Sequence, residues 1–140
     1  MALQKEYEFC DATSVVEDNN SVVLGDVLVC KAEKNAWGTA TYKELGGMTF
    51  VAEVTTTLTG AGTLDLVLTG NTTNTLVSGT ELCKLHFQTT SVAGTIKRLT
   101  LPPGLSASAN YLGVVGITTG ATTAGNVNAY LTIDKGQKAD

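Results

Sequence analysis

The chain has 140 residues and a formal net charge of −4, with charged side chains at 16% of positions. This length is typical of one domain with a substantial core, and the net acidity argues against a surface that binds DNA or RNA. A hydrophobic fraction of 43% excludes a natively disordered chain.

The N-terminal stretch MALQKEYEFC carries charges and lacks the apolar run of a secretion signal. No apolar run approaches the roughly 18–20 residues that span a bilayer. We therefore expect synthesis in the cytoplasm, with no membrane partner. Residues 1–140 are predicted to form a single domain, with an extended N-terminal arm over residues 1–12 and a flexible polar tail over residues 135–140.

The first strand signals lie on either side of Gly25. Short apolar runs cover residues 21–24 and 26–33, and the cluster EDNN precedes them. EDNN is the densest group of acidic and amide side chains, but it lacks the ligand spacing of a calcium-binding loop. We interpret it as a solvated turn.

Two alternating runs follow, over residues 48–58 and 63–70. The TGAG between them has the length and glycine content of a hairpin linker, because glycine tolerates positive φ. Apolar side chains occupy outward as well as inward positions of these runs. Val51 and Val67 are predicted to lie on the outward face.

Four more strands complete the pattern. They are predicted over residues 81–89, 95–101, 110–117 and 126–134. In the last of them Leu131 is predicted to face inward, while Asn128 and Tyr130 face outward. Turn clusters such as TGNTTN, SVAG, PPG and TTGATTAG separate the strands at intervals of about 8–12 residues. With no apolar stripe of helical period, the predicted fold class is all-β: a single-domain antiparallel β-sandwich or jelly roll with little helix.

The residue inventory contains no recognisable catalytic, cofactor or metal site. The only histidine, His86, lies three residues from Cys83, so in a strand the two side chains point to opposite faces and form no local dyad. One histidine with three scattered cysteines also lacks the spacing of a closed zinc site. We therefore expect a surface histidine, no cofactor, no bound metal and a protein that is not an enzyme.

The three cysteines, Cys10, Cys30 and Cys83, have no CxxC spacing. In a reducing compartment we expect free thiols that pack as small apolar side chains. A disulfide between two of them is the alternative.

Five residues are candidates for an interface with other subunits. Outward apolar or aromatic side chains on a weakly charged surface suit packing against another chain. The candidates are Trp37, Tyr42, Val51, Val67 and Tyr130. For Trp37 the alternative role is to cover the edge of the core.

The second half of the chain resembles a known family. It runs GTLDLVLTGN, then LVSGTELCKLHFQTT, then KRLTLPPGLSASANYLGVVGITTGATTAGNVNAYLTID. This order of features is similar to that of the capsid cement (decoration) proteins of tailed bacteriophages, in particular the jelly-roll type known from a Bordetella phage. The early SVVLGD resembles the first strand of the family, whereas residues 31–47, with Trp37, depart from its pattern.

The resemblance implies a structural function in the virion. Many copies would bind the outer surface of an icosahedral head, bridge neighbouring capsomers and stabilise the shell against the pressure of packaged DNA. The implied partners are the major capsid protein and further copies of the chain, as a dimer or trimer on a local symmetry axis. Modest contacts would suffice, because an oligomer that joins several capsid subunits multiplies them through effective concentration.

Two other functions compete with this hypothesis. A carbohydrate-binding jelly roll of a phage fibre or lectin would need an aromatic platform, for which Trp37, Tyr42 and Tyr130 are the candidates. A small hydrolase or isomerase on a β scaffold would have to use His86.

Overall fold

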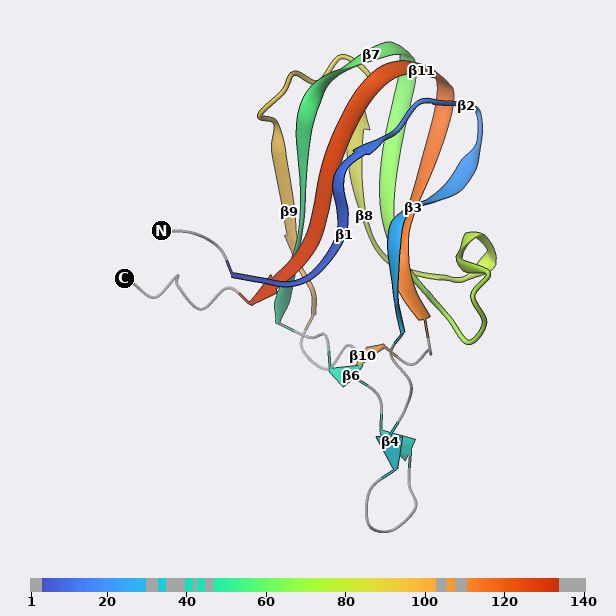
Figure 1. Ribbon diagram of the computed structural model, residues 1–140, viewed down its shortest axis with the longest axis vertical. Coiled ribbons are helices and arrows are strands. Elements are labelled where there is room, and N and C mark those ends of the chain that lie inside the picture. The colour runs from blue at the N-terminus through green and yellow to red at the C-terminus, as the bar shows by residue number, and fades with distance from the viewer. Residues whose placement is uncertain are drawn as a thin grey trace.

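The computed structural model describes residues 4–29, 33–34, 40–41, 43–44, 47–102, 106–107 and 111–133. One antiparallel sheet of seven strands contains most of them (Figure 1). Its strands are β1 (Gln4–Ser14), β2 (Glu17–Asp18), β3 (Ser21–Val29), β7 (Met48–Asn71), β8 (Thr80–Gln88), β9 (Ile96–Thr100) and β11 (Tyr111–Ile133). The main path has the order β1-β11-β7-β8, while β2 and β3 also pair with β11, and β9 pairs with β7.

The remaining elements within these residues are short. β4 (Glu33–Lys34) pairs with β5 (Ala40–Thr41), and β6 (Lys43–Glu44) pairs with β10 (Ser106–Ala107). A single 3-10 turn, η1 (Leu76–Ser78), is the only helical element of the described chain. The prediction of an all-β antiparallel fold with little helix is therefore confirmed.

β7 and β11 form the frame of the sheet. They pair antiparallel over almost their full length, from Tyr111 opposite Asn71 to Ile133 opposite Met48. Both strands arch together over one end of the molecule (Figure 1). The first half of β7 pairs with β9 and the second half with β8, so the same two strands carry both halves of the sheet.

Two segments that were predicted to be turns are part of the arch instead. TGAG (residues 59–62) lies inside β7 and TTGATTAG (residues 118–125) lies inside β11, so neither reverses the chain. The glycines permit a bend while the ladder continues: Gly62 pairs with Gly120 across the two strands. β11 also shifts register between Thr122 and Val127, and such irregularities increase the local twist of a strand.

Gly120 is required by the close approach of the two strands at the bend. Its φ is +86°, a region that L-residues with a side chain adopt at a cost. A Cβ at this position would lie 2.1 Å from the carbonyl oxygen of Ala61 in β7. The backbone of β7 cannot move away from this position without breaking its hydrogen bonds to β11.

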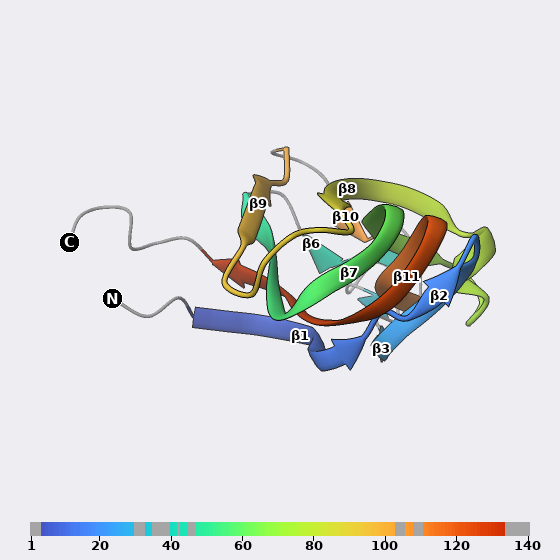
Figure 2. The ribbon, with the colours of Figure 1, turned by 90° about the horizontal axis from the view of Figure 1, so that it is seen from above.

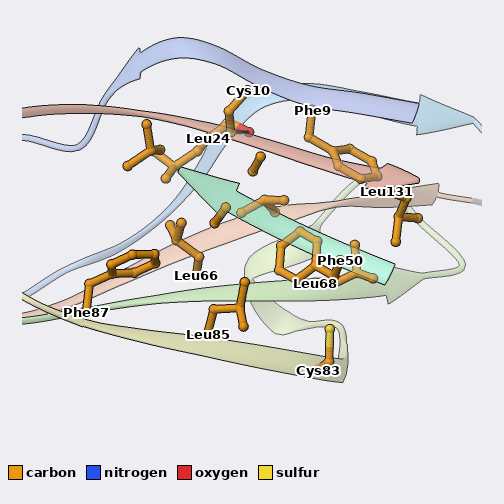
Figure 3. Packing of buried hydrophobic residues seen from close by; sticks show 14 of the residues in the cluster. Phe9, Cys10, Leu24, Phe50, Leu66, Leu68, Cys83, Leu85, Phe87 and Leu131 are labelled. Atoms are coloured by element: carbon orange, nitrogen blue, oxygen red, sulfur yellow. Dashed lines mark hydrogen bonds between the residues drawn. The ribbon is translucent and has the colours of Figure 1, made fainter. Parts of the chain in front are cut away.

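The bend brings one face of the sheet against itself, and the core lies between the two halves. Seen from above, β9, β7, β11 and β1 form one half, and β8, β7, β11 and β3 the other (Figure 2). Phe50 and Leu131 from the first half belong to the same buried cluster as Leu66 and Leu85 from the second (Figure 3). The core residues of β7 keep one alternation through the bend, from Phe50 to Leu66. Those of β11 change from the even-numbered Leu112 to the odd-numbered Leu131, because the register shifts between Thr122 and Val127 offset the strand by one residue.

The N-terminal residues belong to the sheet. Gln4–Ser14 form β1, which pairs with the second half of β11 and places Phe9 and Cys10 in the core. The expected arm over residues 1–12 thus lies within β1 from Gln4 onward. The expected tail over residues 135–140 is outside the described residues.

We predict that Gly120→Ala lowers the free energy of unfolding by about 3 kcal/mol or more, because the methyl group adds a backbone clash to the strain of a positive φ. Chemical denaturation of the variant measures this. Gly94→Ala is the matched control, since Gly94 has a φ of +96° and nothing within 4 Å of its Cβ position. It should cost only about 1 kcal/mol. Equal costs would mean that the close approach at the bend does not constrain the fold.

A second pair of variants tests the register of β11. Leu131 is fully buried, so Leu131→Asp places a charge in the core and is expected to abolish soluble folding. Asn128 accepts a hydrogen bond from the backbone N–H of Ala12 at 2.7 Å, and Asn128→Asp keeps that acceptor oxygen. This second variant should stay soluble with a cooperative thermal transition. Two equally stable proteins would overturn the register.

Candidate interaction surface

Val51 and Val67, predicted to be exposed interface residues, are buried at 1% and 3% exposure. Each lies between core residues in the β7 sequence and so belongs to the opposite, outward face of the strand, as predicted. Val51 lies between Tyr130 of β11 and Arg98 of β9 in register, and β7 has a paired neighbour on both sides at Val67 as well. A short β-branched side chain on a central strand is covered by such neighbours, so the expectation of exposure was wrong.

Tyr130 is also buried, at 8% exposure. It stands opposite Val51 of β7 and Glu8 of β1, so it has a paired neighbour on each side. The expectation of an exposed aromatic at this position was therefore wrong for the same reason. The other two interface candidates, Trp37 and Tyr42, lie outside the described residues.

The η1 turn covers the outward face of the second half of the sheet. Leu76 is fully buried although it belongs to a surface turn. A Cβ on Gly113 of β11 would lie 2.6 Å from the Leu76 Cδ1 atom and 3.7 Å from a methyl group of Val27 in β3. Gly113 thus leaves the space that Leu76 fills. The alternation of apolar residues in the sequence did not predict this small apolar contact.

His86 lies on the outward face of β8, on the opposite side from Cys83, as predicted. Its half-exposed ring places Nδ1 2.5 Å from the Oδ1 atom of Asp65, the residue that faces it on β7. The Nε2 atom lies 3.4 Å from the Gln88 amide nitrogen. A carboxylate can orient an imidazole in this way, but Asp65, His86 and Gln88 form an exposed cross-strand polar row without a nucleophile.

Within the described residues, no group of three or more histidine, cysteine, aspartate or glutamate side chains is placed to hold a metal ion. Nor does any helix in this part of the chain have the length and apolarity to cross a membrane.

Cys10 and Cys83 are buried free thiols, as expected, and Cys30 lies outside the described residues. Figure 3 shows both side chains among the apolar core residues. The Cys10 thiol donates to the backbone carbonyl of Leu24 over 3.6 Å. Burial away from water raises the pKa of both thiols to about 12. They are therefore packing groups and not nucleophiles near neutral pH.

Exposed apolar side chains concentrate on one short segment, residues 92–100, which comprises β9 and the turn before it. Val92, Ile96 and Leu99 are 61%, 46% and 43% exposed. Lys97 and Arg98 lie between them, and every residue of β9 is exposed. We call residues 92–100 the β9 segment. It is the best candidate for an interaction surface in the described chain.

The sequence predicted the strand in this segment but not its exposure. The run TIKRLTL has the same composition of apolar, basic and threonine residues as a half-buried strand would have. Whether a strand lies at an edge depends on which strands pair with it, and that information is non-local.

No protein-family model and no curated protein matches this sequence.

The raised thiol pKa values predict that the protein loses stability in alkali. In the unfolded chain a cysteine ionises near pH 8.5, whereas in the fold Cys10 and Cys83 stay protonated up to about pH 12. The stability that the two protonated thiols contribute is fully present below pH 8.5 and is lost as the pH rises toward 12. At about pH 10 the loss should be about 2 kcal/mol per buried thiol, measured by urea unfolding against about pH 7.5.

The control is the double variant Cys10→Ala with Cys83→Ala, which keeps Cys30. Its absolute stability will be lower because of the lost packing, but its loss between the two pH values should be smaller by the contribution of the two thiols. An unchanged loss in the double variant would show that other groups cause the alkaline sensitivity.

Proposed function

We propose that this protein is a structural capsid cement protein, which binds the outer surface of an icosahedral phage head and bridges its capsomers. The observation that carries this proposal is the resemblance of the second half of the chain to that family. The three resembling stretches, residues 62–71, 76–90 and 97–134, contribute the second half of β7, β8, β9 and β11. The second half of β7 pairs with both β8 and β11, so most of the resembling residues lie side by side in the sheet, whereas β9 pairs with the first half of β7.

We further propose that the fold is a jelly roll. Support comes from the folding of one antiparallel sheet into two facing halves with a shared core. In this arrangement β9 and β8 occupy one end of the two halves, and β1 and β3 the other (Figure 2).

A sheet of this kind suits a load-bearing structural function. β7 and β11 extend and pair through both halves, so a pull on one half is transmitted to the other along these two strands. Many copies on one head would also turn modest contacts into strong attachment through effective concentration. A structural role of this type needs rigidity and exposed contact residues, and it requires no catalytic group.

The proposal is tested by mixing the purified protein with expanded, undecorated capsids of the tailed phage whose major capsid gene neighbours this one. Cryo-electron microscopy should then reveal added density at symmetry-related positions on the outer surface. The decorated shells should also withstand higher temperatures than undecorated shells.

An unfolded protein would give a false negative, so the same preparation is first checked for a cooperative thermal transition. A folded protein that adds no density at saturating concentration would contradict the proposal.

A further inference from the structure

The β9 segment has a free backbone edge. Within the described residues β9 pairs with β7 alone. Leu101 donates to the carbonyl of Met48 over 2.7 Å, and the Val54 N–H donates to the carbonyl of Thr95 over 2.9 Å. In an antiparallel pair such bonded positions alternate with positions whose N–H and C=O groups point away from the partner. The β9 residues whose backbone N–H and C=O groups point away from β7 are Ile96, Arg98 and Thr100.

Apolar side chains flank this edge on both faces of the sheet. Ile96 pairs with Glu53, on the outward face of β7, and Leu99 pairs with Phe50, on the core face. Both side chains are more than two-fifths exposed, at 46% and 43%. Of the six large apolar side chains that are exposed in the described chain, three lie in the β9 segment. An added strand would therefore find apolar contacts as well as hydrogen-bonding groups.

Lys97 does not occupy the free edge. Its ammonium lies over the ring of Phe87, 5.2 Å from the ring centroid, and donates a hydrogen bond to the backbone carbonyl of His86 on β8. Lys97 thus spans from β9 to β8 and covers the core between them. Its positive charge therefore lies at β8.

Arg98 supplies the charge on the edge itself. It is exposed on the outward face, opposite Val51, and makes no ion pair within the described chain. An antiparallel pair of two β9 strands centred on Arg98 would bring the arginines of both copies together, and like charges in directly opposed positions are destabilising. Arg98 therefore disfavours pairing of β9 with a second copy in this register and favours an acidic strand.

We propose that β9 is a docking strand, which receives an extended acidic segment of a partner protein as an additional strand of the sheet. Main-chain hydrogen bonds to Ile96, Arg98 and Thr100 would supply affinity, and carboxylates facing Arg98 would select the segment. This inference rests on the proposed function in that the segment belongs to the capsid protein. The edge chemistry can be tested without a capsid.

The first experiment measures the binding of a capped peptide of about six residues, the usual length of a strand, with alternating glutamate and valine. The wild-type chain should bind it, and Arg98→Glu should weaken binding by about tenfold or more. The same peptide with lysine in place of glutamate should show the reverse preference and bind Arg98→Glu better. Lys84→Glu is the matched control, because Lys84 is an exposed cation on β8 away from the β9 edge, and it should bind the acidic peptide like the wild type.

A peptide of the same sequence with N-methylated amides tests the backbone contribution. It keeps its charges but cannot complete the ladder, so it should not bind. Equal binding of the methylated peptide, an equal effect of Lys84→Glu, or no binding of the acidic peptide to the wild-type chain would each overturn the docking strand. Dimerisation of the wild-type chain that Arg98→Glu abolishes would overturn it as well, because β9 would then be a contact between copies.

Capsid binding separates this inference from the proposed function. If the wild type decorates capsids and Arg98→Glu decorates them equally well, the docking strand is wrong and the capsid function stands. If the wild type decorates no capsid but binds the acidic peptide through Arg98 as described, the capsid function is wrong and the docking strand stands.

Discussion

The hydrogen-bonded ladder between β7 and β11 is the constraint on which the rest of the structure depends. Every other strand of the main sheet pairs with one of these two. The ladder continues through the bend with register shifts in β11, and these shifts keep the apolar side chains of both halves on one face, which becomes the core. The glycine pair Gly62 and Gly120 makes this possible, since side chains at these two positions would force the strands apart.

The same ladder determines where the protein can interact. Central strands have neighbours on both sides, so even outward side chains such as Val51 and Tyr130 are largely covered. Contact with another protein then depends on the edges of the sheet, where backbone groups and apolar side chains remain accessible. At the β8–β9 end, Lys97 covers the core while the outward edge of β9 stays available. β9 can therefore cover the core through Lys97 and still present its free backbone edge to a partner.

The sequence predicted the positions of the alternating strands better than their ends. Alternation over residues 81–89 and 126–134 identified the inward positions correctly, including Cys83 and Leu131. It failed where glycine clusters occurred, because glycine permits a bend, a bulge or a reversal equally, and only the pairing partner decides among them. TGAG was therefore predicted as a hairpin linker although it continues β7 through the arch.

The all-β class and the two faces of the alternating strands could be predicted from the sequence alone, since a period of two depends only on local side-chain order. The outward direction of Val51, the opposite directions of Cys83 and His86, and the buried nature of Cys10 and Cys83 follow from this and from composition. The pairing of Gln4–Ser14 as β1 could not be predicted in this way, because it depends on the distant β11. Which outward positions are exposed could be read only from the folded sheet, because exposure depends on the strands that lie on either side. Val51 lies between two neighbours and is covered, whereas Ile96 has one neighbour and is not.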